Sequence, residues 1–397
     1  MYSKEMPHDL THVALILFLA FLGGLLLQYF RQPRLIGYIL VGSLIGPNML
    51  GLQANDPTLH WLSELGIILL MFMLGLELDI SRFRRALSPA LWVTTLQIIG
   101  SLGIMLSAGW FFGWPWELAI ILGFAAALSS TAVAMTTLRE LGELNSSAGR
   151  LSTAILIAQD LAVIPMLLTI GVLQDGSLTF ADVTTTLINV GVVVLTLFGI
   201  FELHTHPHWL ERIERVLTHG RQQPVIAGLA LCFGAAAVSG ALGLSTAYGA
   251  FALGLLIGNI GTIGASYRHA VAPLHDLLLM IFFLSIGVLL DLSFVWDNIL
   301  LITGVLAAVV FLKTIGNYLI LRTLGIQRRT ALIMGTTLGQ IGEFSFVLVA
   351  LGLSSGFITT HSYQITLAVV ALSLALSPAW LSLVRSQVGL KTPPRAR

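Results

Sequence analysis

Long apolar stretches separated by short polar connections dominate this chain of 397 residues. A helix of about 20 apolar residues crosses the ~30 Å hydrocarbon layer of a membrane, and most of the stretches approach that length. The pattern predicts an all-α polytopic membrane protein with thirteen transmembrane helices, at residues 11–30, 35–51, 61–77, 88–113, 115–138, 148–173, 183–203, 224–241, 244–260, 273–290, 298–322, 330–353 and 362–384.

The composition supports a lipid environment. Charged residues make up 10% of the chain, hydrophobic residues 56%, and the mean hydropathy is +0.91. A soluble domain carries roughly 25% charged residues. The formal net charge of +1 gives no reason to expect nucleic acid as a partner.

The distribution of positive charge predicts the orientation of the helices. If the N-terminus lies outside, all 20 lysines and arginines except Lys4 and Lys313 fall in cytoplasmic connections or at the C-terminus. Cytoplasmic loops carry such an excess, and an error of one helix would scramble it. We therefore expect a multi-pass protein of the cell (inner) membrane with a cytoplasmic C-terminus.

An odd number of spans divides into two six-helix repeats and one linking helix. The two repeats, at about 11–173 and 224–384, would then have opposite orientation, with a linker helix at about 183–203, as in many secondary transporters. Small and polar residues lie at membrane depth in both halves, at 127–133 and 335–344. They favour two broken helices that cross at a substrate site, although close packing of intact helices is the alternative.

Three charged residues fall clearly inside the predicted spans, away from the ends of those spans: Asp160, Lys313 and Glu343. Asp160 is ten residues from Arg150, roughly 15 Å along a helix, which places it near the middle of the bilayer. A charge at that depth costs at least ~2.5 kcal/mol, so such residues usually have a function. Lys313 lies at a similar depth and is the expected charge partner of Asp160. The alternative is that the two residues form an ion pair with a structural role alone.

Oxygen-bearing side chains near Asp160 suggest the ligand. Gln159 and the hydroxyls of Ser129, Ser130 and Thr131 would complete a site for a partly dehydrated monovalent cation at Asp160. Burial favours the protonated acid, whereas a bound cation favours the carboxylate, so the two ions compete. If only loaded states cross the membrane, the result is antiport. Glu343 and Gln340 are expected at the crossover or along the ion path.

Five stretches of the chain resemble the monovalent cation:proton antiporter-2 family, especially its Kef-type potassium/proton members, and the resemblance extends to sodium/proton exchangers. They are Phe72-Met-Leu-Gly-Leu-Glu-Leu-Asp79, Leu128-Ser-Ser-Thr-Ala-Val-Ala134, Gln159-Asp-Leu-Ala-Val-Ile-Pro165, Phe282-Phe-Leu-Ser-Ile-Gly-Val-Leu-Leu-Asp291 and Gly339-Gln-Ile-Gly-Glu-Phe-Ser-Phe346. The resemblance covers all thirteen predicted spans.

This resemblance implies a sodium/proton antiporter-like fold and a homodimer in which a mobile domain carries the site by an elevator-like shift. It also implies that Asp160 binds the ion, that Ser130 and Thr131 help to coordinate it, and that Lys313 pairs with the acid. Kef-type proteins carry a soluble regulatory domain after the last span, whereas about thirteen residues follow it here, so a single transmembrane domain over 1–397 is expected. Whether a separate regulatory subunit binds is left open.

Two other functions compete with antiport. A sodium-coupled organic anion symporter also uses crossed broken helices, and a membrane sensor or channel-like subunit would move no ions by exchange. A pump would need a nucleotide site, but the phosphate-binding Gly-x-x-x-x-Gly-Lys-Ser/Thr pattern is absent from the sequence. We therefore expect neither enzymatic activity nor a cofactor. The sequence does not choose between K⁺ and Na⁺.

Overall fold

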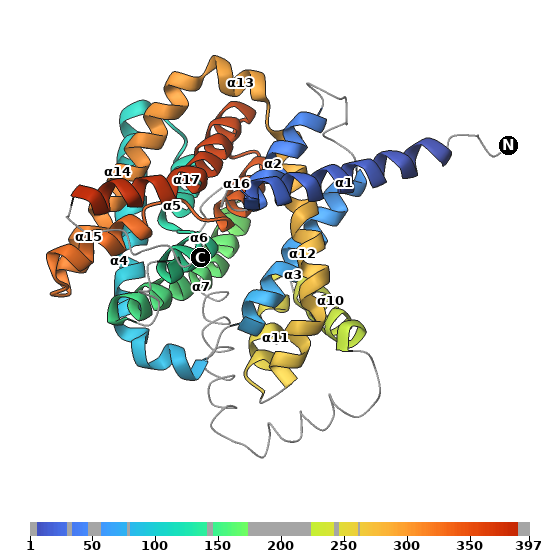
Figure 1. The fold of residues 1–397 in the computed structure, drawn as a ribbon, viewed down its shortest axis with the longest axis horizontal. Helices are drawn as coiled ribbons and strands as arrows, with labels where there is room; N and C mark the ends of the chain where they lie inside the picture. Colours follow the sequence, from blue (N-terminus) through green and yellow to red (C-terminus); the bar gives the residue numbers. More distant parts are fainter. Residues whose placement is uncertain are drawn as a thin grey trace.

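The computed structural model describes residues 6–29, 34–46, 57–77, 80–140, 146–173, 224–241, 246–260 and 263–387. Within these ranges the regular structure is entirely helical (Figure 1). The helices are α1 (Met6–Tyr29), α2 (Arg34–Ile45), α3 (Pro57–Glu77), α4 (Ile80–Phe112), α5 (Trp116–Ala127), α6 (Thr131–Glu140), α7 (Ser147–Leu173), α10 (Pro224–Ala241), α11 (Thr246–Gly258), α12 (Ile263–Leu289), α13 (Leu292–Asp297), α14 (Ile299–Thr323), α15 (Arg328–Thr337), α16 (Phe344–Ser354) and α17 (Thr360–Gln387).

The lengths of these helices suit a membrane protein. In the described part of the chain, six of them are long and apolar enough to cross a bilayer, namely α4, α7, α10, α12, α14 and α17, and shorter apolar helices accompany them. Twelve of the thirteen predicted segments contain described helix. The remaining segment, 183–203, lies outside the described residues, so the count of thirteen stays a prediction.

The predicted start of one segment was wrong. The apolar run at 273–290 suggested a helix that begins near Pro273, but α12 begins ten residues earlier, at Ile263. The additional turns contain Arg268 and His269. These residues lower the hydropathy of the stretch, so the apolar pattern did not mark it as part of the helix. A helix that protrudes beyond the hydrocarbon layer can carry polar residues, so hydropathy marks the buried length of such a helix and not its end.

The helices form two bundles, which lie on opposite sides of Figure 1. The first bundle comprises α1, α2 and α3 together with α10, α11 and α12. The second comprises α4, α5, α6 and α7 together with α14, α15, α16 and α17, and α13 leads into it. Each bundle therefore combines helices from the first half of the chain with helices from the second half.

Close backbone approach holds the first bundle together. A Cβ atom on Gly287 of α12 would lie 2.1 Å from the carbonyl oxygen of Ile39 in α2. A Cβ atom on Gly254 of α11 would similarly lie 2.2 Å from the carbonyl oxygen of Phe72 in α3. Small residues at such contacts allow van der Waals packing between helices in lipid, where the hydrophobic effect between helices is weak.

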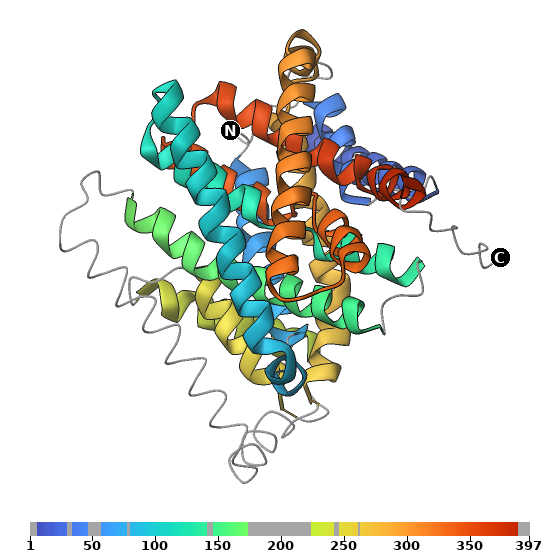
Figure 2. The ribbon, with the colours of Figure 1, turned by 90° about the vertical axis from the view of Figure 1, so that its left-hand side faces the viewer.

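The second bundle presents α4 and α14 on the face turned toward the viewer in Figure 2. These two helices pack against each other and expose large apolar side chains, including Ile99 on α4 and Leu300 and Leu319 on α14. Aromatic side chains gather where α4 ends, with Trp110 87% exposed. Tryptophans concentrate at membrane–water interfaces, so this end of α4 fits the level of the lipid headgroups.

Candidate ion-binding site

Two interrupted helices meet inside the second bundle. The first interruption, at 128–130, separates α5 from α6, and the second, at 338–343, separates α15 from α16. The backbone N–H of Gly342 donates to the carbonyl of Leu128 at 3.1 Å, and the hydroxyl of Ser129 donates to the carbonyl of Leu338 at 2.8 Å. The predicted crossing of two broken helices is therefore confirmed. Each break supplies a hydrogen-bond donor for a backbone carbonyl of the other break that has no partner within its own helix.

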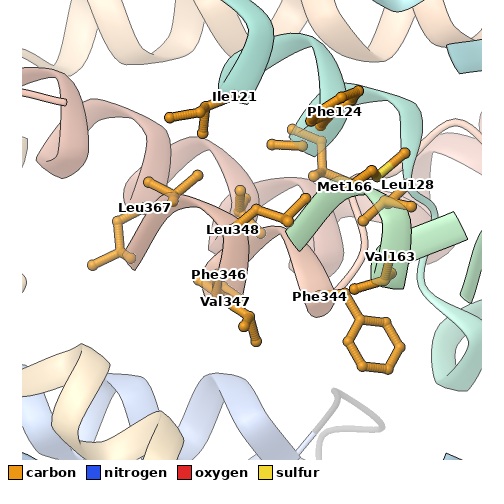
Figure 3. Close-up of a cluster of buried hydrophobic side chains, with 14 of the residues drawn as sticks. Ile121, Phe124, Leu128, Val163, Met166, Phe344, Phe346, Val347, Leu348 and Leu367 are labelled. Atoms are coloured by element: carbon orange, nitrogen blue, oxygen red, sulfur yellow. The ribbon is translucent and has the colours of Figure 1, made fainter. Parts of the chain in front are cut away.

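Glycine permits this close crossing. A Cβ atom on Gly342 would lie 2.8 Å from the carbonyl carbon and oxygen of Ser129. Apolar side chains from α5, α7, α16 and α17 pack around the crossing, as Figure 3 shows for Phe124, Val163 and Leu348 among others. Val163 and Leu348 are fully buried. The residues of both breaks are therefore largely buried among apolar side chains.

Asp160 lies on α7 with its side chain against the first break. It is 3% exposed, and one carboxylate oxygen accepts a 2.8 Å hydrogen bond from the hydroxyl of Thr131. Thr131 is the first residue of α6, so the acid lies beside the N-terminal end of that helix, where the helix dipole favours negative charge.

Lys313 occupies a different position from the one predicted. Its ammonium donates to the carbonyl oxygen of Leu128 at 2.5 Å. Among the described residues, no ion pair joins it to Asp160. The reason is local: Leu128 caps the C-terminal end of α5, where helical carbonyls have no partner and the dipole favours a cation. Asp160 therefore faces the N-terminal end of α6, whereas Lys313 faces the C-terminal end of α5, and the two side chains do not face each other.

The other residues predicted around Asp160 also lie at the first break. The side-chain oxygen of Gln159 accepts a 3.0 Å bond from the backbone N–H of Ser129. The hydroxyl of Ser130, one residue before α6, accepts a 3.3 Å bond from the N–H of Val133 and so caps the start of that helix. Both serines are buried. Of these side chains, Thr131 contacts the carboxylate directly.

Gln340 and Glu343 both lie on the second break. The amide nitrogen of Gln340 donates to the carbonyl of Ser130 at 3.3 Å, and its amide oxygen accepts a 3.4 Å bond from the hydroxyl of Ser377 on α17. Glu343 is the residue immediately before α16, again at the positive end of a helix. Both residues therefore lie at the crossover, and their part in an ion path stays a prediction.

Two buried amides that the sequence analysis missed also contact the site. Gln97 on α4 and Asn317 on α14 are 5% and 4% exposed. Gln97 donates to Asn317 at 2.8 Å and accepts from Gln159 at 2.8 Å. Asn317 could have been found from its spacing, because it follows Lys313 by four residues and so shares its helix face.

A cavity of about 90 Å³ lies beside these groups, between α4, α5 and α14. Its polar lining comes from Gln97, Ser101, Lys313 and Asn317. Apolar residues such as Leu96, Ile104 and Leu312 form most of the remaining wall. The described residues contain no group of three or more His, Cys, Asp or Glu side chains placed to hold a metal ion. The candidate site is therefore a single buried carboxylate that contacts the hydroxyl of Thr131, with Gln159 preceding it on the same helix.

Comparison with known proteins identifies the class. The sequence profile described as "Sodium/hydrogen exchanger, transmembrane" matches residues 16–385. The chain belongs to this sodium/hydrogen exchanger family, whose members are membrane transporters and not enzymes.

Individual relatives add detail. The chain is 38% identical over 388 residues to a protein named "Iron transporter MagA" from Paramagnetospirillum magneticum, covering 96% of this chain and 87% of that protein. A structure of the sodium proton antiporter MjNhaP1 from Methanocaldococcus jannaschii at pH 8 is similar with a TM-score of 0.71 and 17% identity, covering 96% of each chain. A second structure of MjNhaP1, from electron microscopy, has a TM-score of 0.63 and 15% identity and covers 98% of this chain and all of the other. These structural matches show a shared fold.

Proposed function

We propose that this protein exchanges a monovalent cation, K⁺ or Na⁺, for H⁺ by alternating access, with both ions competing for Asp160. The observation that carries the proposal is the position of that carboxylate: it is almost fully buried, yet it contacts the hydroxyl of Thr131 at a break in a membrane helix. Family membership supports cation/proton exchange. A buried carboxylate is costly unless a proton or a cation neutralises it, and each excludes the other.

The electrostatics of the two breaks support the same assignment. Half-helix ends near the membrane midplane are typical binding elements of secondary transporters. Here Thr131 starts α6 beside Asp160, while the ammonium of Lys313 lies at the end of α5. In the proposal Thr131 and Ser130 supply ligand oxygens, Gln159 supports the acid, and Gln340 and Glu343 line the crossover. The transported ions are substrates, and no cofactor is required.

The proposal extends to the arrangement of the whole protein. The bundle of α1–α3 with α10–α12 unites the first helices of the two predicted repeats, and the second bundle unites their last helices. This pairing supports two inverted repeats within thirteen spans. We further propose an inner-membrane homodimer, with the N-terminus outside and the C-terminus in the cytoplasm, in which the second bundle moves relative to the first.

The test uses the purified chain in proteoliposomes that contain a pH-sensitive dye. Addition of Na⁺ or K⁺ on one side should move protons in the opposite direction, and Li⁺ and Rb⁺ extend the series. Because the ions compete, a more acidic medium should raise the apparent KM for the cation. Asp160→Asn should abolish exchange, whereas Asp291→Asn, which changes a carboxylate that caps α13, should retain it. Exchange that survives in Asp160→Asn would falsify the assignment of the site.

The name of the relative from Paramagnetospirillum magneticum favours a second candidate, transport of iron. In this case the buried carboxylate of Asp160, with the hydroxyl of Thr131 beside it, would receive Fe²⁺ as the transported ion. The same proteoliposomes, loaded with an iron-sensitive dye, distinguish the two candidates. Iron uptake without any response to Na⁺ or K⁺ would replace the monovalent proposal.

A further inference from the structure

Three buried amide side chains from different helices form a continuous series of hydrogen bonds across the second bundle. The backbone N–H of Ser129 donates to Gln159 at 3.0 Å, Gln159 donates to Gln97 at 2.8 Å, and Gln97 donates to Asn317 at 2.8 Å. Asn317 then donates to the carbonyl of Leu338 at 3.0 Å. Because the hydroxyl of Ser129 donates to the same carbonyl at 2.8 Å, the series returns to the residue where it began. We call this set of residues the amide ring.

The backbone groups at its two ends give the amide ring one direction. The N–H of Ser129 can only donate, so Gln159 must present its oxygen there and its NH₂ group to Gln97. The carbonyl of Leu338 can only accept, so Asn317 must present its NH₂ group there and its oxygen to Gln97. Both ends therefore require the same orientation of the central amide of Gln97, and a flip of any member would place two donors or two acceptors against each other.

The amide ring connects the helix that carries Asp160 with both breaks and with α14. Gln159 precedes Asp160 on α7, Ser129 belongs to the first break, and Leu338 belongs to the second. Asn317 follows Lys313 by one helical turn on α14. Hydrogen bonds from α14 therefore reach both breaks: Lys313 donates to Leu128 in the first, and Asn317 donates to Leu338 in the second. Gln97 joins α7 to α14 and is the one member contributed by α4.

We propose that Gln97 is a positioning residue of the ion site, a role that rests on the proposed exchange at Asp160. Gln97 closes the amide ring and thereby fixes the distance between α7, the helix that carries Asp160, and the two breaks. That distance sets the spacing of the oxygens that receive the cation. Selectivity and affinity for alkali cations depend on such spacing. Gln97 itself does not contact the carboxylate and acts through Gln159.

The direct test measures exchange by purified Gln97→Met in proteoliposomes, normalised to folded protein. Methionine fills a similar volume but leaves the NH₂ group of Gln159 and the oxygen of Asn317 without partners. We expect the apparent KM for the cation to rise on the order of tenfold, with a smaller change in kcat. The control is Thr94→Val on the same helix, since Thr94 is buried and donates to the carbonyl of Ile155 at 3.4 Å, outside the amide ring. Its KM should stay within about twofold of the parent.

A rescue experiment separates positioning from general destabilisation. Gln97→Asn shortens one amide and Asn317→Gln lengthens the amide that it contacts, so each single variant should raise KM. The double variant restores the combined length, and its KM should return to within about threefold of the parent.

The outcomes distinguish this inference from the proposed function. If the parent protein exchanges ions but Gln97→Met keeps an unchanged KM, or if the double variant is no better than the single variants, the inference is wrong and antiport at Asp160 stands. If the parent moves no protons with any monovalent cation, the proposed function itself fails, and the positioning role falls with it.

Discussion

The hydroxyl of Thr131 donates to the carboxylate of Asp160 at 2.8 Å, which joins the first turn of α6 to the middle of α7. This contact brings a neutral oxygen to the buried acid at the positive end of a half-helix. A cation bound by the carboxylate would find the hydroxyl oxygen within reach, and a proton bound there would find an acceptor. The same pair of side chains can therefore serve either ion.

Removal of this hydroxyl should weaken cation binding. Thr131→Val preserves the shape of the side chain but removes its oxygen, so we expect the apparent KM for the cation to rise on the order of tenfold. Thr131→Ser keeps the oxygen and should stay close to the parent. Transport assays over a range of cation concentrations measure the effect, with Thr303→Val as the control because Thr303 is exposed and bonds within its own helix. An unchanged KM in Thr131→Val would remove this residue from the ligand set.

The ammonium of Lys313 should matter mainly to the stability of the crossover. The carbonyl of Leu128 accepts both from Lys313 and from the N–H of Gly342. Loss of the charged donor in Lys313→Met should therefore lower the free energy of unfolding by about 1.5–3 kcal/mol. Lys313→Gln retains an N–H donor and should lose less.

Thermal unfolding in detergent, read alongside exchange, checks this prediction. Leu319→Met, a change at an exposed apolar residue of the same helix outside the cavity, is the control. If Lys313→Met unfolds at the parent temperature but shifts the pH dependence of exchange, the charge acts on Asp160 and not on the end of α5.

Close contact between the two breaks should make Gly342 intolerant of any side chain. Gly342→Ala would place a methyl group 2.8 Å from the backbone of Ser129, so the breaks would have to separate. Overpacking of this kind costs about 1–3 kcal/mol and should also reduce exchange. Gly304→Ala is the control, since no atom lies within 4 Å of the added carbon and alanine in a helix should stabilise by about 0.5–1 kcal/mol. Equal unfolding temperatures for the two variants would contradict the packing argument.

The sequence predicted the parts of this structure that depend on depth in the membrane. Apolar stretches gave the helices, and small polar residues at membrane depth marked both breaks, because backbone there must find partners inside the protein. The prediction that the breaks meet was correct for the same reason. Asp160 was found because a carboxylate within an apolar run is costly.

The sequence did not predict which groups lie side by side at the same depth. The sequence predicted a similar depth for Lys313 and Asp160, but spacing along the chain gives no information on the direction in which each helix turns its side chain. The carbonyl of Leu128 becomes an acceptor for Lys313 only because α5 ends there. Gln97 and Asn317 were overlooked because the sequence analysis singled out charged residues at membrane depth, although a neutral amide must also find hydrogen-bond partners once it is buried.

The junction between the bundles offers a last prediction. Gln364 on α17 accepts from the backbone N–H of Asp291 at 3.0 Å and donates to the carbonyl of Leu289, so it holds the connection from α12 to α13. Gln364→Leu leaves both backbone groups without these partners, and we expect a loss of about 1–3 kcal/mol in stability and faster deuterium uptake at 289–294. If the bundles move relative to each other during exchange, kcat should change while KM stays constant. Thr366→Val is the control, because Thr366 bonds within its own helix. Unaltered deuterium uptake at this junction would show that Gln364 does not hold it.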